Sequence, residues 1–198
     1  MNGVDEVGKK TLVFLGHPSN SSLCAELHRE YVQGALHAGK DVRELMLGDL
    51  DFDPLLKEGY RGNQPLEPDL LKAREDILWA EHLVFVYPIW WGGMPALQKG
   101  FIDRTFLPGF AFKYRKGSSL WDKLLTGRSA HCLVTMDSPP WYFRWVNRMP
   151  GHHQMKKTIL EFCGIKPVRI TSFGAVKPSS AELRAQWLGQ ARAFGQND

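Results

Sequence analysis

The sequence predicts a doubly wound α/β fold with a five-stranded parallel sheet. The short apolar run at residues 11–16 is typical of a strand that is buried on both faces, as in a parallel sheet, and four further segments are interpreted as strands. A segment with apolar residues at helical spacing follows each expected strand, so strands and helices alternate along the chain. The expected strands are residues 11–16, 42–47, 82–87, 130–136 and 168–173.

Residues that favour helix ends mark the five expected helices. Pro68 and Pro95 stand in first turns, where proline is tolerated, and Ser179 with Glu182 matches a capping box. The helices are expected at residues 23–38, from 68 to about 80, from 95 onward, at 152–162 and from 179 onward. Residues 48–65, 107–127 and 137–151 have no clear period, so we expect them to be irregular.

Length and composition fit one domain and exclude several classes of protein. A chain of 198 residues with 43% hydrophobic residues can bury a substantial core, so we expect a single domain over residues 1–198. The net charge is only +4 and no basic run indicates nucleic-acid binding. No segment is apolar enough to be a leader or to insert into a membrane.

The three cysteines, at positions 24, 132 and 163, are widely spaced. They form no cluster with histidine that indicates zinc, so no metal is expected. Free thiols are typical of a reducing compartment, and the cytoplasm is therefore the expected location.

Three loops are expected to meet at the carboxyl ends of the strands, where doubly wound sheets bind ligands. They are residues 17–22, 88–95 and 137–151. The first loop, HPSNSS, precedes a helix N-terminus, which suits a phosphate group. Ser19, Ser21 and Ser22 can add hydroxyl donors to such a site. Simple helix capping, which needs only one serine, is the alternative.

The second loop, PIWWGGMP, combines rigid prolines with glycines that let a ligand approach the backbone. Trp90 and Trp91 are costly to leave in water, so a flat aromatic ligand packed against them is one interpretation. A tight turn with both tryptophans in the core or in a dimer interface is the other.

The third loop is rich in aromatic residues, with Arg144 and Arg148 among them. Such a segment can form a lid over a planar anionic substrate. Nucleic-acid stacking and an oligomer interface are competing uses of the same composition. His152 and His153 follow at the expected helix start, where a solvated role competes with a catalytic one. The aromatic residues are Trp141, Tyr142, Phe143 and Trp145.

Several different motifs follow one another in order over about residues 11–175. Residues 80–106, AEHLVFVYPIWWGGMPALQKGFIDRTF, follow the pattern A-[DE]-x-[IL]-V-F-x-x-P-x-x-W-x-x-x-P-A-x-L-K-G, with Gln98 interpreted as an insertion. Weaker matches are GHP at residues 16–18, GFAFKY at 109–114 and ILEFCG at 159–164. On these motifs the chain resembles the flavodoxin-like NAD(P)H:quinone oxidoreductase family.

The resemblance implies a three-layer flavodoxin-like fold and a bound flavin, with FMN as first choice and FAD as second. Family members commonly carry T-T-G-G after the fourth strand, whereas this chain has Thr135, Met136, Asp137 and Ser138. An aspartate near a reduced, anionic flavin is unfavourable unless it points away. The implied cofactor-binding residues are His17, Ser19, Ser21, Ser22, Leu23, Pro88, Ile89, Trp90, Trp91, Gly92, Thr135, Met136 and Asp137.

The resemblance also implies a substrate pocket and a homodimer. Phe112 and Tyr114 stand where the family has two substrate-pocket aromatics, and Phe162 stands where a residue reaches across a dimer interface. Together with Trp141 from the third loop, Phe112 and Phe162 are the expected pocket residues. Tyr114 and His153 are the catalytic candidates, as proton donors to the acceptor.

The implied activity is hydride transfer from NAD(P)H, through the flavin, to a quinone-like acceptor. The protein would contribute stacking, orientation and hydrogen bonds. A flavin-binding regulatory subunit of a potassium-efflux-type system shares these motifs and is the alternative. A flavodoxin-type electron carrier is a third possibility, but such carriers are usually acidic and this chain is basic.

Overall fold

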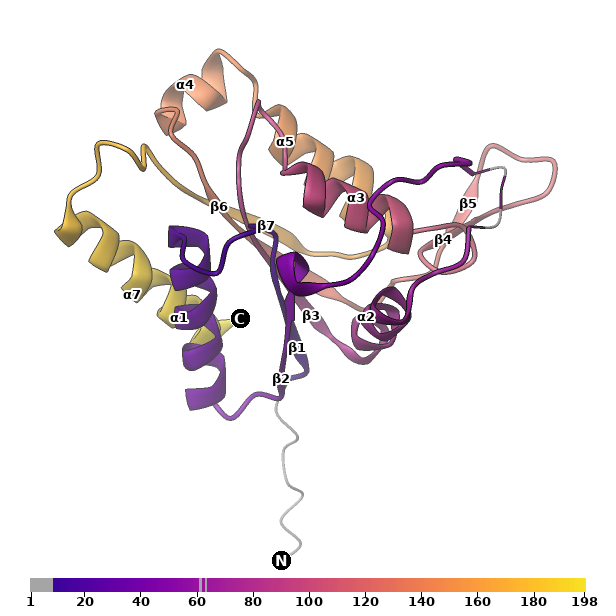
Figure 1. Ribbon diagram of the computed structural model, residues 1–198, viewed down its shortest axis with the longest axis horizontal. Coiled ribbons are helices and arrows are strands. Elements are labelled where there is room, and N and C mark those ends of the chain that lie inside the picture. Colours follow the sequence, from indigo (N-terminus) through magenta and orange to yellow (C-terminus); the bar gives the residue numbers. More distant parts are fainter. Residues whose placement is uncertain (1–8, 61, 63) are drawn as a thin grey trace, which may run out of the picture.

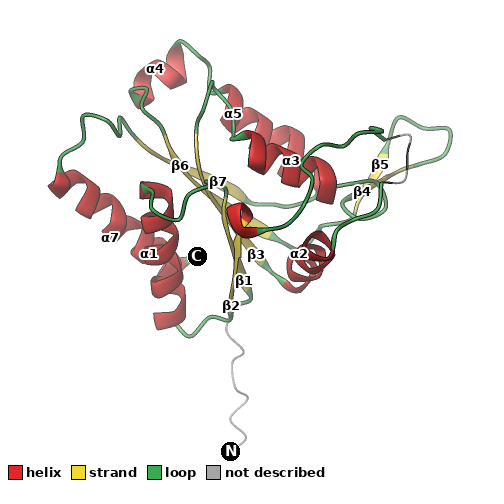
Figure 2. Ribbon diagram, viewed as in Figure 1, coloured by secondary structure: helices red, strands yellow, loops and turns green. Residues whose placement is uncertain are grey.

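The computed structural model describes residues 9–60, 62 and 64–198. Its main sheet has five parallel strands in the order β2-β1-β3-β6-β7, which confirms the expected doubly wound fold (Figure 1 and Figure 2). Residues 1–8, where the sequence predicted no leader, lie outside the described part. The strands are β1 (Thr11–Leu15), β2 (Val42–Met46), β3 (His82–Pro88), β6 (Ser129–Thr135) and β7 (Val168–Phe173).

Helices cover both faces of this sheet and complete a three-layer fold. Successive strand residues point to opposite faces, so Val13 and Val84 join one core cluster while Phe14 and Phe85 join the other. Figure 1 shows helices on both sides of the sheet. The first face carries α1 (Leu23–His37) and α7 (Ala181–Asn197), and the second carries α2 (Pro68–Trp79), α3 (Ala96–Thr105) and the helical segment 150–163.

Two glycines allow α1 and α7 to pack closely. A Cβ atom at Gly34 would lie 2.0 Å from the backbone oxygen of Arg192, and one at Gly195 would lie 2.0 Å from that of Tyr31. Real Cβ atoms do not come this close to backbone oxygens. The contact between the two helices therefore depends on glycine at both positions.

Several short elements interrupt the segments that the sequence predicts to be irregular. None of them is long enough to show a clear period in the sequence. They are η1 (Leu47–Asp49), α4 (Pro140–Trp145), and the antiparallel pair β4 (Phe112–Tyr114) and β5 (Trp121–Lys123). The helix expected at 152–162 is observed as a run of α5 (Pro150–His153), the π-helical η2 (Gln154–Leu160) and α6 (Glu161–Cys163).

Two local expectations are wrong. Helix α3 runs without interruption through Gln98, so this residue is no insertion and occupies the leucine position of the family pattern. The N-cap of α7 is Ser180, not Ser179, because the Ser180 side chain accepts a hydrogen bond from the Leu183 N–H. The Ser179 hydroxyl is already engaged, since it donates to the backbone oxygen of Val176.

A buried arginine on α3 holds the long connection between η1 and α2. The Arg104 side chain is fully buried, and its guanidinium donates to the backbone oxygens of Asp53 and Pro65. It also forms two hydrogen bonds with the Glu67 carboxylate, at 3.1 and 2.8 Å. We call this set of contacts the Arg104 clasp. The Arg104 clasp holds both ends of the connection between η1 and α2 against α3, the helix that follows the second loop.

Candidate active site

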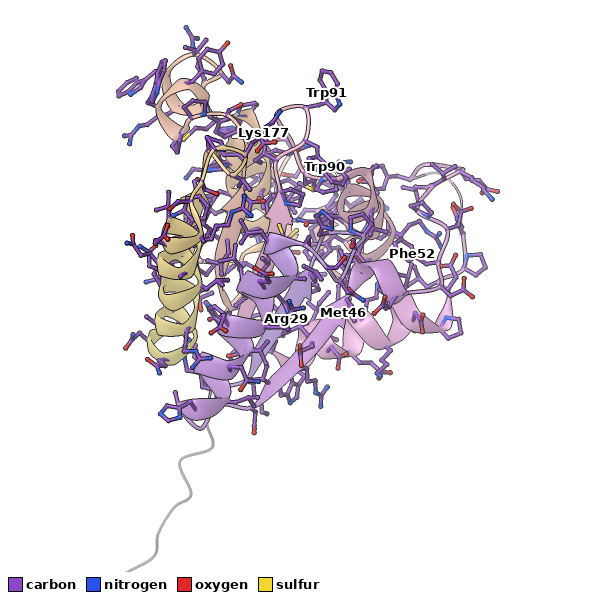
Figure 3. The ribbon with its side chains drawn as sticks, turned by 60° about the vertical axis from the view of Figure 1, so that its left-hand side comes forward. Arg29, Met46, Phe52, Trp90, Trp91 and Lys177 are labelled. Atoms are coloured by element: carbon purple, nitrogen blue, oxygen red, sulfur yellow. The ribbon has the colours of Figure 1, made fainter. Side chains whose placement is uncertain are left out.

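The three expected loops meet around one cavity at the carboxyl ends of β1, β3 and β6. The cavity has a volume of about 190 Å³. Figure 3 shows Trp90, Trp91 and Lys177 gathered at this end of the molecule. Cys24 and Val176 line the cavity and were not predicted from the sequence. The complete lining is His17, Ser22, Leu23, Cys24, Pro88, Ile89, Trp90, Thr135, Met136, Asp137 and Val176.

The first loop is held by its own hydrogen bonds. Ser22 is the N-cap of α1, and its side chain accepts a hydrogen bond from the Ala25 N–H at 3.2 Å. His17 Nδ1 accepts a hydrogen bond from the Ser19 N–H at 2.9 Å. The hydroxyls of Ser19 and Ser21 lie 3.0 Å apart; Ser19 is half-buried and Ser21 is exposed. One serine thus caps the helix, and two more present hydroxyls beside it.

The second loop is a tight turn that turns its tryptophans outward. The backbones of Trp90 and Gly93 form two reciprocal hydrogen bonds, and the residues between them have positive φ angles. Trp91 is fully exposed, whereas Trp90 is 45% exposed and meets the His17 ring edge-on at 5.6 Å. Burial of the two tryptophans in the protein core is therefore excluded, and a ligand or an interface remains as their partner.

The end of β6 and the residues after it contribute three side chains to the cavity: the buried Thr135 and Met136, and the carboxylate of Asp137. Thr135 Oγ1 lies 3.2 Å from Cys24 Sγ, and Met136 is buried. The Asp137 carboxylate accepts a hydrogen bond from the Lys177 N–H at 3.0 Å. The carboxylate is therefore bound to the chain between β7 and α7, although Asp137 also lines the cavity. Burial raises the pKa of the Cys24 thiol to about 12, so this group stays protonated near neutral pH.

Two further pockets lie next to the cavity. The cavity shares Ile89, Met136 and Asp137 with a pocket of about 510 Å³. That pocket shares Trp91, Gly92, Asn147 and Pro150 with a third of about 600 Å³, which we call the loop pocket. The exposed face of the second loop therefore borders a series of adjacent pockets.

The expected substrate residues do not lie with the expected cofactor residues. Phe112, Tyr114 and Phe162 line a separate pocket of about 510 Å³, which we call the aromatic pocket. The Phe112 ring meets the Tyr114 ring at 5.3 Å and the Phe162 ring at 5.1 Å. Gln154 and Thr158 are the residues that this pocket shares with the loop pocket. Trp141 is not among the lining residues and lies 64% exposed on α4.

The two adjacent histidines have different environments. His152 is buried, and its Nε2 lies 2.7 Å from the Ser172 hydroxyl. Burial lowers its pKa to about 4, so this imidazole is neutral at neutral pH. His153 is exposed and lines the loop pocket together with Arg148. Arg148 and Met149 have positive φ angles, a conformation that the sequence pattern did not predict.

Among the helices that the structure describes, none combines the length and the apolar composition that a membrane span requires. Within the same part of the chain, no group of three histidine, cysteine or acidic side chains is placed to hold a metal ion.

The sheet order and the position of the cavity define a class of protein. Ligands of doubly wound α/β proteins bind outside the carboxyl ends of the strands, where the strand order reverses. Here that point lies between β1 and β3, and the cavity stands at their ends. The chain belongs to the flavodoxin-like fold family, whose model matches residues 9–194.

Named relatives point to one kind of chemistry. The chain is 28% identical over 170 residues to an "Uncharacterized NAD(P)H oxidoreductase" of Haemophilus influenzae, covering 83% of each chain. It is 27% identical to an "FMN-dependent NADH:quinone oxidoreductase" of Caldicellulosiruptor saccharolyticus, over 76% of this chain and 66% of the relative. The solved structure of Smu.1420 from Streptococcus mutans is 31% identical, with a TM-score of 0.81 over 95% of this chain and 99% of that one. The resemblance to this family of oxidoreductases is thereby confirmed.

Proposed function

We propose that the protein is a flavin-dependent oxidoreductase that transfers two electrons from NAD(P)H to a quinone-like acceptor. The observation that carries the proposal is the cavity at the β1/β3 switch point, which is lined by Trp90 of the exposed turn and by Ser22 at the N-terminus of α1. Relatives named NAD(P)H oxidoreductase and FMN-dependent quinone oxidoreductase support the same activity.

The residues around the cavity fit FMN, with FAD as the second choice. The cavity of about 190 Å³ is smaller than the roughly 300–1,000 Å³ of common ligand sites, but with the adjoining pocket it reaches that range. The N-terminus of α1, with Ser19 and Ser21 beside it, suits the phosphate group. The turn of Trp90 and Trp91 offers flat apolar surface and close backbone for the ring.

In this arrangement the flavin supplies the hydride chemistry and the chain supplies binding and orientation. The neutral turn amides near Trp91 can donate hydrogen bonds to the polar edge of the ring. Asp137 is directed toward the Lys177 N–H, which reduces its repulsion of a reduced, anionic flavin. Tyr114 and His153 are the proposed proton donors to the acceptor, and both are exposed enough to meet it.

A homodimer would complete the site. The aromatic pocket with Phe112, Tyr114 and Phe162 shares no lining residue with the cavity beside Trp90. In a dimer, the aromatic pocket of one copy can lie over the flavin of its partner. Light scattering on the flavin-loaded protein should give twice the mass of the chain, and a monomer at concentrations where the protein is active would contradict this part. The three buried free cysteines support a cytoplasmic location.

The test begins with the cofactor. Protein purified with its ligand is heated, and the released compound is identified by chromatography. The loaded protein is then assayed for NAD(P)H oxidation with a simple naphthoquinone. We expect FMN and sustained turnover. Bound flavin without turnover would favour the regulatory alternative, and a protein unable to take up any flavin would overturn the proposal.

A substitution in the second loop separates cofactor binding from folding. Because the Trp91 side chain is fully exposed, Trp91→Ala should change the free energy of unfolding by no more than about 0.5 kcal/mol. Its affinity for flavin should fall about fivefold if the ring packs on this residue, since loss of a stacking surface costs about 1 kcal/mol. Trp145→Ala is the matched control, because Trp145 is also exposed but lines none of the three adjacent pockets.

A further inference from the structure

A further pocket lies next to the loop pocket and shares Arg148 and His153 with it. It has a volume of about 430 Å³. Its lining contains four basic or histidine side chains besides Arg148 and no acidic residue. The lining residues are Arg148, Met149, His152, His153, Lys156, Lys157 and Ile170. We call it the cationic pocket.

The positive charge of this pocket is only partly neutralised by the chain itself. Lys157 forms an ion pair with Glu161 at 2.8 Å. Among the described residues, neither Arg148 nor Lys156 has a hydrogen bond or ion pair through its side chain. Arg148 and Lys156, which form no ion pair within the described part of the chain, share one concave surface, and this favours an anionic ligand. Lys157 first, and also Lys156, lower the pKa of the Glu161 carboxyl, so that carboxylate offsets part of the Lys156 charge.

The backbone holds Arg148 in an uncommon conformation. Arg148 and Met149 have φ angles of 58° and 50°, and for residues other than glycine this left-handed region costs about 1–2 kcal/mol each. The Met149 N–H donates to the Phe143 oxygen, and the Met149 oxygen accepts from the His153 N–H, both at 3.0 Å. Met149 also packs against the core. The two hydrogen bonds and the core packing of Met149 hold this strained backbone in place. Strained backbone conformations that are maintained in this way are typical of functional sites.

Two residues connect this pocket to the proposed flavin site. Arg148 and His153 line both the cationic pocket and the loop pocket, and the loop pocket is bordered by Trp91 and Gly92. A ligand that places one end on the flavin at the second loop can therefore extend toward Arg148. His152 Nδ1, which is buried in the wall of the cationic pocket without a hydrogen-bond partner among the described residues, adds a polar group there.

We propose that the cationic pocket, through Arg148, binds the 2′-phosphate of NADPH and makes NADPH the preferred electron donor over NADH. The inference rests on the proposed function, because it assigns the donor of that same site. NADPH and NADH differ in this phosphate, and the planar guanidinium of arginine matches a phosphate with paired hydrogen bonds. Lys156 contributes a second positive charge to the same surface.

The kinetic test compares the two donors in one variant. For flavin-loaded Arg148→Ala, the ratio of kcat/KM for NADPH to that for NADH should fall about 10–100-fold, which is the usual effect of losing a charged hydrogen bond. Arg148→Lys keeps the charge without the planar fork and should lose less. Arg144→Ala is the matched control, because its guanidinium stacks over the Trp145 ring at 5.3 Å and is not part of the pocket. An unchanged donor ratio in Arg148→Ala would overturn the proposal.

A binding measurement separates this inference from the proposed function. The flavin-loaded protein is titrated by calorimetry with adenosine 2′,5′-bisphosphate and with 5′-AMP. Tighter binding of the bisphosphate, lost in Arg148→Ala and retained in Arg144→Ala, supports the pocket even if neither donor is oxidised. Equal binding of the two nucleotides would overturn it while leaving NAD(P)H turnover untouched. A rise in KM for a sulfonated quinone alone would assign Arg148 to the acceptor and would also overturn it.

Discussion

Gln98 carries a polar side chain that the protein buries without hydrogen bonds. It is 1% exposed, and neither its Oε1 nor its Nε2 has a partner among the described residues. Gly16 leaves room for it, because a Cβ atom at Gly16 would lie 1.8 Å from Gln98 Oε1. Burying an unpaired amide costs about 1–3 kcal/mol in protein variants. The corresponding position of the family pattern is leucine, whose size is similar.

Replacing this glutamine with leucine should therefore stabilise the protein. Gln98→Leu removes the unpaired amide, while imperfect packing of the new side chain costs less than about 1.5 kcal/mol. We expect a net gain of about 1–2 kcal/mol in the free energy of unfolding. For a chain of this length that corresponds to a rise in melting temperature of about 2–8 °C.

Urea and thermal unfolding of the wild type, Gln98→Leu and Gln98→Glu measure this effect. Gln98→Glu places a carboxyl group at the same site, and at neutral pH it should be destabilised by several kcal/mol. A loss of more than about 1 kcal/mol in Gln98→Leu would refute the reasoning. It would mean that the amide is hydrogen-bonded in solution, for example to a buried water molecule.

Four other substitutions test three separate parts of the fold. Gly195→Ala should cost at least about 1–3 kcal/mol by overpacking α7 against α1, whereas Gly189→Ala, which meets nothing within 4 Å, should stabilise by about 0.5–1 kcal/mol in the same unfolding assay. Arg104→Ala should cost about 3–5 kcal/mol, because it leaves the Glu67 carboxylate without its buried partner; a loss below 1 kcal/mol would contradict the clasp. Burial lowers the pKa of His28 to about 4, so its protonation favours the unfolded state as pH falls from about 6.5 to 4. His28→Gln should therefore lose about 2 kcal/mol less stability than the wild type between pH 7 and pH 4.5, and an identical pH profile would contradict this.

The sequence was sufficient for the main sheet because its signals are strong and local. Strands β1, β3 and β6 are largely apolar and buried, as is typical of a parallel sheet. Strands β2 and β7 each contain an arginine and are partly exposed, and the alternation of strand and helix segments along the chain placed them in the same sheet. The pair β4 and β5 was missed because its strands are three residues long and mostly exposed, so no alternation of polar and apolar residues is visible. Helix α4 was missed because six residues are too few for a helical period, and prolines stand at its start.

The candidate site was predictable in position and less so in detail. The rule that ligands bind at strand carboxyl ends chose the loops that line the cavity, including His17, Trp90 and Asp137. The left-handed backbone at Arg148 could not be predicted, because arginine has no preference for that region. The separation of Phe112 and Phe162 from the cavity depends on packing between distant segments. A local sequence pattern therefore cannot predict that these two residues lie apart from the cavity.

The Arg104 clasp has a consequence for how this chain can diverge or be engineered. Its contacts at Asp53 and Pro65 hold the two ends of the connecting segment in place whatever lies between them. A change in the length of that stretch then costs mainly loop-closure entropy, which is only about 0.6 kcal/mol for each doubling. We therefore expect peptide tags placed between these two anchors to leave α3 in position when Pro54, which packs against Gly100, and Tyr60, which lines the aromatic pocket, are kept.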